Sequence, residues 1–354
     1  MKALIERLIE EGVAGVVATG AAAAQGGVWV TAAAGATETY FDLASLTKPM
    51  TALAIGWSGL DVRAALGDLV AEAKGTASET VPVELLLAHR AGLEAHLPLF
   101  APLLTGESVD VAAAIARAAD ARRADARGEA PAGGFAPVYS DLGYVLAGVA
   151  LARHVGARDA GEAIERVVVA RLGLAGVLGT ARSLAARVDA NHFEAHVAPT
   201  EDVTWRGGVV RGAVHDENAW ALTGMGGSGH AGMFGTVAAV LALGTAAHDA
   251  VRDDPGLAWM TRPRQGGSLL AGWDGKSPEG SSAGTRMGPR TFGHLGFTGT
   301  SVWIDPDART VVTLLTNRVH PTRENITIRA ARPAAHDALF AAALALIREH
   351  DDAP

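Results

Sequence analysis

The sequence contains no cysteine, which excludes disulfide bonds and thiolate zinc sites and removes one usual support for an extracellular location. It also lacks a basic stripe interleaved with aromatic residues, and its formal net charge is −8. The positive surface that nucleic acid requires is therefore missing, and we expect no nucleic acid partner. With 354 residues, 49% of them hydrophobic, the chain is typical of a globular protein with two compact units, or of one large domain with an insertion.

Long unbroken apolar runs are also absent. Residues 1–11 place apolar and charged side chains at helical spacing, which predicts an amphipathic helix and not a signal peptide. The longest mainly apolar stretch, 231–247, contains three glycines and two threonines and is too short to cross a bilayer comfortably. We therefore predict no membrane span and a cytoplasmic location. The pattern gives no oligomeric state.

The distribution of secondary structure patterns predicts the fold class. Valine-rich runs at 12–19 and 27–31 predict two strands joined by a tight connection, and residues 47–59 predict a helix. Helical patterns follow at 83–89, 109–123, 142–154 and 160–171, and then a glycine-rich stretch, 173–235, shows little periodicity. A helix is predicted from 236 to 247, strands at 292–296, 300–304 and 310–316, and a last helix at 333–350.

Strands at both ends of the chain with helices between them indicate an α/β fold of the α+β type. We predict an antiparallel sheet flanked by helices, built from residues 1–60 and 236–354. A mainly helical domain, residues 61–235, would be inserted between these segments, with the active site at the junction of the two domains.

Lysine is scarce, and one of the four lysines, Lys48, follows Ser45 by three residues. A serine hydroxyl is a poor nucleophile at neutral pH, and a spacing of three in a helix brings the lysine amine close enough to accept its proton. Ser45 lies at or just before a predicted helix N-terminus, where backbone N–H groups converge. The pair predicts an activated nucleophile, although twelve serines and four lysines can produce such a spacing by chance.

Two further segments could meet this pair. Tyr139 could carry protons if a cation such as Lys48 lowered its pKa, and Asp141 could hold Lys48 or a substrate amide. The alternative is a half-buried aromatic residue followed by an aspartate that caps the next helix. His294 lies in a glycine-rich strand region that a ligand could approach, or it is an ordinary strand histidine.

Together these motifs resemble those of a large family that contains class C serine β-lactamases, penicillin-binding D,D-peptidases and related esterases. Its marks are Ser-x-x-Lys, Tyr-x-Asn or Tyr-Ser-x, and Lys-Thr-Gly or His-x-Gly, in this order. The resemblance covers about residues 40 to 320, through the segments 41–48, 84–93, 139–144, 229–235, 293–301 and 314–320.

The resemblance implies a role for each matching residue. Ser45 would form the acyl-enzyme, Lys48 would accept its proton, and Tyr139 would pass that proton to the leaving group. The backbone N–H groups of Ser45 and Phe297 would form the oxyanion hole. Substrate binding would fall to Asp141, His294 and Gly296, and two further histidines, His215 and His230, can line the site or hold the long loop. No metal or cofactor is implied.

Two departures from the family pattern affect the expected substrate. His294 stands where lactamases and peptidases carry lysine, and it is a weaker, pH-dependent cation, so a substrate carboxylate should dock less well at pH 7. Asp141 replaces asparagine, which removes an amide donor and adds a negative charge. Both changes point away from an efficient β-lactamase and toward the esterase and uncharacterised hydrolase branches.

Other motif matches are weaker. Residues 224–229 match a dinucleotide fingerprint by letter, yet no buried parallel strand is predicted before them, so a glycine-rich loop at the substrate edge is preferred. Residues 275–277 resemble the end of a phosphate loop, but leucine occupies the place of its first glycine. His192 and His196 have the spacing of a helical metal pair, but their segment is not predicted to be helical and no third ligand is evident. No Gly-x-Ser-x-Gly motif is present.

The function predicted from these residues is a serine hydrolase that acts on a small ester or amide, or on a peptide such as one bearing a D-amino acid. A true class C-type β-lactamase or a D,D-carboxypeptidase is the alternative within the same chemistry. The alternative from another class is a non-catalytic sensor that binds penicillin or peptides on the same scaffold.

Overall fold

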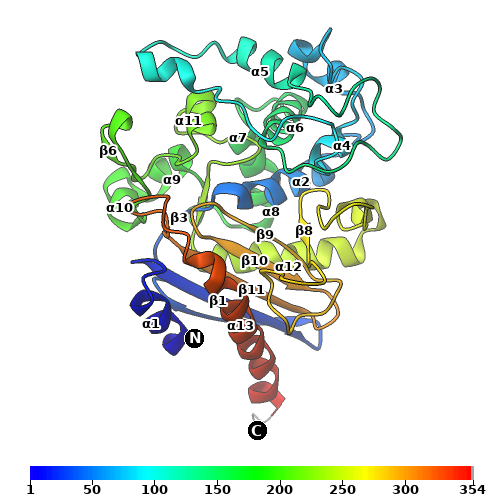
Figure 1. The fold of residues 1–354 in the computed structure, drawn as a ribbon. Coiled ribbons are helices and arrows are strands. Elements are labelled where there is room, and N and C mark those ends of the chain that lie inside the picture. The colour runs from blue at the N-terminus through cyan, green and yellow to red at the C-terminus, as the bar shows by residue number, and fades with distance from the viewer. Residues whose placement is uncertain (352–354) are drawn as a thin grey trace.

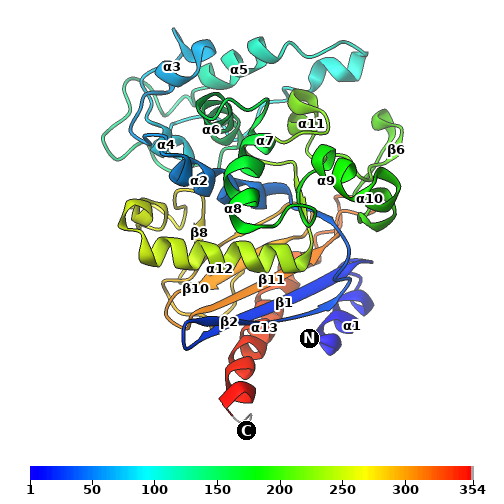
Figure 2. The ribbon, with the colours of Figure 1, turned by 180° about the vertical axis from the view of Figure 1, so that it is seen from behind.

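The structure is a computed structural model that describes residues 1–351, with side chains described through residue 347. A helical region lies above a twisted sheet in Figure 1, and helices cover both faces of that sheet (Figures 1 and 2). Six antiparallel strands form the sheet in the order β2-β1-β11-β10-β9-β8. Their bounds are β1 (Val17–Gln25), β2 (Val28–Gly35), β8 (Asp274–Gly275), β9 (Phe292–Leu295), β10 (Ser301–Asp305) and β11 (Thr310–Thr316).

The two ends of the chain meet in this sheet, which confirms the predicted fold class. Strand β1 pairs with β2 on one side and with β11 on the other. The β1–β2 connection consists of Gly26 and Gly27, both at positive φ, as a two-residue hairpin turn requires. Strand β1 begins and ends later than the predicted run 12–19, and β2 extends beyond the predicted run 27–31. The alanines of β1 are weak strand formers by themselves and become part of the sheet through tertiary packing.

Helices cover both faces of the sheet, and they come from the first and last parts of the sequence. Helix α12 (Val237–Asp253) packs on the face that carries Ala18 and Ala22. Helices α1 (Lys2–Glu10) and α13 (Ile328–Asp351) pack on the opposite face, with Val17 and Ala21. A Cβ atom on Gly20 would lie 2.7 Å from Leu241 Cδ1, so this glycine allows α12 to approach the sheet closely. The small side chains of β1 therefore serve packing on two sides.

The helical region surrounds α2 (Thr47–Ser58), whose residues 47–55 are all buried. A helix that is apolar on every side is expected in the centre of a protein. The other helices of this region are α3 (Leu66–Leu69), α4 (Val83–Leu87), α5 (Val111–Asp120), α6 (Asp141–His154), α7 (Ala160–Ile164), η4 (Glu165–Val169) and α8 (Ala170–Leu172). Short 3-10 helices are η1 (Ala44–Leu46), η2 (Ala71–Ala73), η3 (Ala101–Thr105), η5 (Thr204–Arg206) and η6 (Pro255–Met260).

The prediction of little regular structure in residues 173–235 was wrong. This stretch forms α9 (Ala181–Val188), α10 (Ala190–His196) and α11 (Glu217–Thr223), besides a small sheet of β3 (Phe41–Asp42), β7 (Met233–Gly235) and β4 (Leu178–Thr180) and a pair of β5 (Asp202–Val203) and β6 (Gly208–Val209). Each helix is too short to show a clear period. Their N-caps, Thr180, Asp189 and Asp216, accept backbone N–H bonds and were the readable signal.

One helix among the described residues has the length and apolarity of a membrane span. It is the part of α13 from Ile328 to Ile347, and a third of that segment is buried in the structure. Its buried residues, including Leu339 and Ala343, pack against the sheet. Core helices pass the same test of length and composition, so this helix is weak support for a membrane location.

Candidate active site

The first candidate residue, Ser45, lies in η1 at the entrance to α2. The residue before it, Ala44, has a φ of 47°, a left-handed conformation that costs free energy for a residue with a Cβ atom. The buried carboxylate of Asp42 supports this turn, because Oδ1 accepts the Ala44 N–H at 2.8 Å and Oδ2 accepts the His215 N–H at 2.8 Å. The chain thus fixes Ser45 on a strained, well-supported turn.

Lys48 stands next to Ser45 as the spacing predicted. Its ammonium nitrogen Nζ lies 2.8 Å from Ser45 Oγ and 2.8 Å from Asp141 Oδ1. The Lys48 side chain is fully buried, whereas that of Asp141 is 24% exposed toward the pocket. A lysine buried this deeply needs a partner for its charge, and the structure supplies a carboxylate within hydrogen-bond distance.

The protonation state of Lys48 follows from that partner. Burial alone would lower the pKa of Lys48, but the Asp141 carboxylate and the Tyr139 phenol outweigh burial and raise the pKa above its ordinary value. Burial would raise the pKa of Asp141, and the Lys48 ammonium lowers it below its usual range. At neutral pH the pair is therefore an ammonium and a carboxylate, and Lys48 must lose a proton before it can accept one from Ser45.

Tyr139 lies on the other side of the same ammonium group, with its ring centroid 4.7 Å from Lys48 Nζ. The tyrosine was expected to carry protons if a cation lowered its pKa. Lys48 does act in that direction, but burial is the larger effect and the pKa of Tyr139 is raised. Tyr139 is consequently a neutral phenol at pH 7, able to donate a proton and not to accept one in the resting state.

The alternative explanation for Asp141, a helix cap, was wrong. The N-cap of α6 is Ser140, whose hydroxyl accepts the Gly143 N–H, and Asp141 is the first residue inside the helix. The Asp141 carboxylate is therefore free to pair with Lys48. The Ser140 hydroxyl also donates to the Glu94 carbonyl at 2.6 Å, which ties the segment that carries Tyr139 to the neighbouring loop.

His294 is not the cation that its position in the third motif led us to expect. Its imidazole is 4% exposed, and burial, followed by the nearby Lys48 charge, lowers its pKa to about 3. Nδ1 lies 2.9 Å from the Leu295 carbonyl, which can only accept, so Nδ1 carries the proton. The ring sits 6.0 Å from the Tyr139 ring and is absent from the pocket lining. A neutral His294 brings no positive charge to a substrate.

The predicted oxyanion donors, the backbone N–H groups of Ser45 and Phe297, lie on two segments that hydrogen bonds join. Thr298 Oγ1 donates to the Asp42 carbonyl at 2.7 Å, and Thr300 Oγ1 donates to the Leu43 carbonyl at 3.0 Å. These bonds hold the β9–β10 turn against the residues that precede Ser45. Ser45 and Phe297 both line the same pocket, so the two N–H groups are carried by adjoining walls.

Gly296 is required by this close contact. A Cβ atom there would lie 1.9 Å from Thr300 Oγ1 and 2.6 Å from the Leu43 carbonyl oxygen. We expect Gly296→Ala to break the Thr300 bond and displace the Phe297 N–H, with activity falling by about 10²-fold, the cost of losing one oxyanion donor. The kcat of an ester substrate measures the effect, with Gly15→Ala as a control at an exposed position where a Cβ atom would meet nothing within 4 Å. An unchanged kcat in the Gly296 variant would show that Phe297 is not such a donor.

The two remaining predicted histidines lie at different depths. His215 lines the pocket, its Nε2 is 3.2 Å from Glu201 Oε2, and its ring stacks on that of Phe297 at 5.7 Å. His230 lies behind the pocket wall, with Nε2 2.8 Å from Asp216 Oδ1. The His230 backbone carbonyl lies 3.5 Å from Lys48 Nζ. His215 is therefore a lining residue, whereas His230 supports the lysine from behind.

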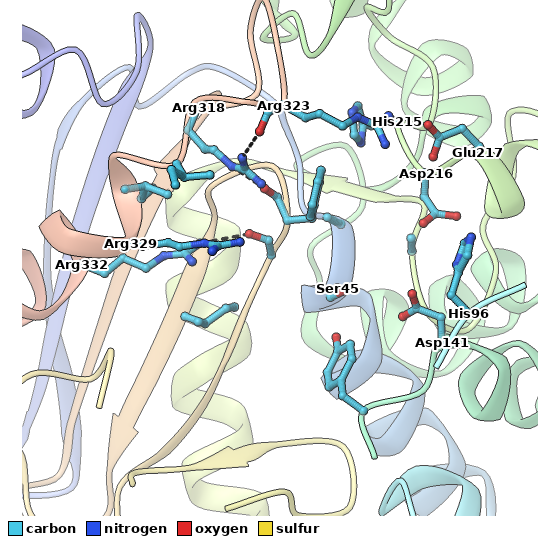
Figure 3. A pocket seen from close by; sticks show the side chains of 18 of the residues that line it. Ser45, His96, Asp141, His215, Asp216, Glu217, Arg318, Arg323, Arg329 and Arg332 are labelled. Atoms are coloured by element: carbon cyan, nitrogen blue, oxygen red, sulfur yellow. Dashed lines mark hydrogen bonds and ion pairs between the residues drawn. The ribbon is translucent and has the colours of Figure 1, made fainter. Parts of the chain in front are cut away.

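These residues meet at a pocket of about 500 Å³, a size typical of small-molecule sites. Figure 3 shows Ser45 in the middle, the arginines Arg318, Arg329 and Arg332 on one side, and the acidic residues on the other. Among the acidic residues, Asp141 was predicted and Glu217 was not. The arginines were missed too, because Arg318 lies in the recognised segment 314–320 without an assigned role, and Arg329 and Arg332 lie beyond that segment and carry no motif of their own.

His89 was not predicted as a site residue, although it belongs to the family-like segment 84–93. Its Nδ1 accepts the Ser140 N–H at 2.9 Å, and its ring stacks on that of Tyr139 with centroids 4.6 Å apart. Burial, followed by Lys48, lowers the pKa of His89 to about 3, so it is neutral. His89 positions Tyr139 by stacking on its ring.

Two of the weaker motif matches can now be placed. His192 and His196 lie in helix α10, so the prediction of a non-helical segment was wrong; their rings stack 4.1 Å apart. Within residues 1–351 no group of three or more His, Asp or Glu side chains is arranged to hold a metal ion. The glycine-rich loop packs on α6, where a Cβ atom on Gly229 would lie 2.1 Å from the Tyr144 carbonyl oxygen.

Comparison with known proteins agrees with this geometry. The Beta-lactamase family matches residues 3–336 of the chain. A class C beta-lactamase from Rhodobacter sphaeroides superposes with a TM-score of 0.66 at 17% identity, covering 97% of this chain and 99% of that one. The hydrolase EstCE1, described as having promiscuous acyltransferase activity, superposes with a TM-score of 0.67 at 20% identity, covering 96% and 97%. At such identities the likeness concerns the fold alone.

A similar sequence occurs in Salmonella agona (strain SL483), in a protein provisionally named a D-alanyl-D-alanine carboxypeptidase. It is 34% identical over 119 residues, which are 31% of this chain and 27% of that protein. The chain thus matches little more than a quarter of the length of this relative. Because the family match spans most of the sequence and the fold agrees with it, the chain belongs to the Beta-lactamase family.

Proposed function

We propose that the protein is a serine hydrolase that cleaves a small ester or amide through an acyl-enzyme on Ser45. The observation that carries the proposal is the contact of Ser45 Oγ with Lys48 Nζ at 2.8 Å, on the wall of a pocket of about 500 Å³. Lys48, once neutral, accepts the serine proton, and the Tyr139 phenol donates a proton to the leaving group. Water then releases the acyl group from Ser45.

The charges beside Ser45 favour an ester over an amide substrate and disfavour an efficient β-lactamase. His294 is neutral in the place where lactamases carry a lysine, and Asp141 holds Lys48 as an ammonium. A nucleophile with a protonated base acylates slowly, and esters tolerate this better than amides because their leaving groups are more easily expelled. Ready hydrolysis of the β-lactam nitrocefin would favour the lactamase alternative instead. The cytoplasmic location stays a prediction.

Turnover of p-nitrophenyl butyrate tests the proposal. We expect steady hydrolysis by the wild-type protein and only the uncatalysed rate with Ser45→Ala. Acylation without turnover would favour the non-catalytic sensor, because a sensor needs an acyl adduct on Ser45 that water does not hydrolyse. Equal turnover by the wild type and Ser45→Ala would show that another group is the nucleophile.

A further inference from the structure

Three arginines on the segment after β11 form one wall of the pocket: Arg318, Arg329 and Arg332, here called the arginine wall (Figure 3). Arg318 donates to the backbone carbonyls of Phe297, Arg323 and Asn325. Arg332 Nη2 donates to the carbonyls of Gly296 and Thr300, at 3.0 Å each. No ion pair joins any of the three to an acidic side chain of the described residues.

Arg323, on the same segment, shows the opposite arrangement. It pairs with Glu201 at 2.6 Å and also with Glu217. The acids on the far side of Ser45 are likewise paired, Asp141 with Lys48 and Asp216 with His230. The arginines of the pocket lining that have no acidic partner among the described residues are therefore those of the arginine wall.

Holding this wall together without an anion is unfavourable. Arg332 is 8% exposed, and its Nε is buried with no hydrogen-bond partner. Burial lowers the pKa of Arg332 to about 10, and the charges of Arg318 and Arg329 act in the same direction. The guanidinium groups of Arg318 and Arg329 thus act against the charge of Arg332, and an anion placed among the three would relieve this repulsion.

We propose that the arginine wall binds a doubly negative group of the substrate, a dicarboxylate or a phosphate, while the scissile carbonyl lies at Ser45. A single carboxylate would leave two of the three positive charges uncompensated, whereas a dianion balances most of them and offers acceptors to more than one guanidinium. His294 adds no charge of its own. This inference rests on the proposed function, since it names the charge of the substrate of the same site.

Binding to the Ser45→Ala protein tests the inference without turnover. Isothermal titration at about pH 7.5 would compare benzoate, isophthalate and phenyl phosphate, whose second pKa of about 6 makes it largely a dianion there. We expect at least one of the two dianions to bind about tenfold or more tightly than benzoate. Tight binding of isophthalate alone identifies a dicarboxylate, and tight binding of phenyl phosphate alone identifies a phosphate. Similar affinities for all three probes would overturn the proposal.

Two variants distinguish binding of the dianion by the arginine wall from a general effect of the protein's positive charges. Arg329→Gln removes a wall charge at an exposed position, and Arg211→Gln removes the same charge at an exposed position outside the pocket lining. Dianion affinity should fall by about tenfold in the first and by less than twofold in the second. Equal losses in both would contradict the proposal. Because no reaction is measured, this result is independent of whether Ser45 is acylated.

Discussion

Replacing Lys48 with methionine is expected to slow acylation of Ser45 by about 10³-fold, within the range for loss of a general base. Methionine has a similar length and keeps the buried volume, but it cannot accept the proton of a hydroxyl 2.8 Å away. The Asp141 carboxylate, left without its ammonium partner, is 24% exposed and can be hydrated, which limits the damage to the fold. The rate constant of covalent labelling by a fluorophosphonate, which phosphonylates the serine and releases fluoride, measures the nucleophilic attack of Ser45 that acylation also requires.

The matched control for this variant is Lys74→Met, because Lys74 is an exposed lysine outside the pocket lining. It should label at the wild-type rate. A loss below about tenfold in Lys48→Met would mean that the base lies elsewhere. Thermal denaturation of both variants verifies that slow labelling reflects chemistry and not an unfolded protein.

Replacing Asp141 with asparagine is expected to move the rise of the acylation rate to lower pH, by about 1 to 3 pH units. The rate grows with the fraction of Lys48 that is neutral, and Asp141 is the largest of the causes that raise the pKa of Lys48. Removing its charge leaves burial as the dominant influence, and burial lowers the pKa of Lys48. A larger neutral fraction at pH 7 then makes the variant faster there than the wild type.

The pH dependence of fluorophosphonate labelling between about pH 5 and 10 tests this expectation. Asp253→Asn, which removes a carboxylate from an exposed position on α12, should leave the profile in place. If Asp141→Asn shifted the rise to higher pH, or slowed labelling at every pH, Asp141 would have to aid proton transfer and not oppose it. The sign of the shift therefore separates two roles that the distances alone allow.

The sequence predicted the strands of the sheet and the contact of Ser45 with Lys48, because each rests on a local pattern of residues. Ser45 lies in η1 and Lys48 in the first turn of α2, three residues further on, so their contact depends only on the local path of the backbone. The closure of the sheet by β1 and β11 followed from strand signals at both ends. By contrast, α9, α10 and α11 were missed, because seven or eight residues are too few to reveal a period.

Electrostatics were the least predictable part of the site. The low pKa of His294 and the raised pKa of Tyr139 both result first from burial, which depends on packing between distant segments. The arginine wall is likewise a tertiary feature. Arg318 and Arg332 are fourteen positions apart, and only the path of the chain into α13 brings both to the pocket. Composition and motif order carry no such information.

The central claim is that Ser45 is the nucleophile of an acylating site. Mass spectrometry of the protein after treatment with a fluorophosphonate tests it most directly, with peptide mapping of the modified residue. We predict a single adduct on the peptide that contains Ser45 and none on the Ser45→Ala protein. An adduct of equal yield on the Ser45→Ala protein, or on a peptide without Ser45, would contradict the claim.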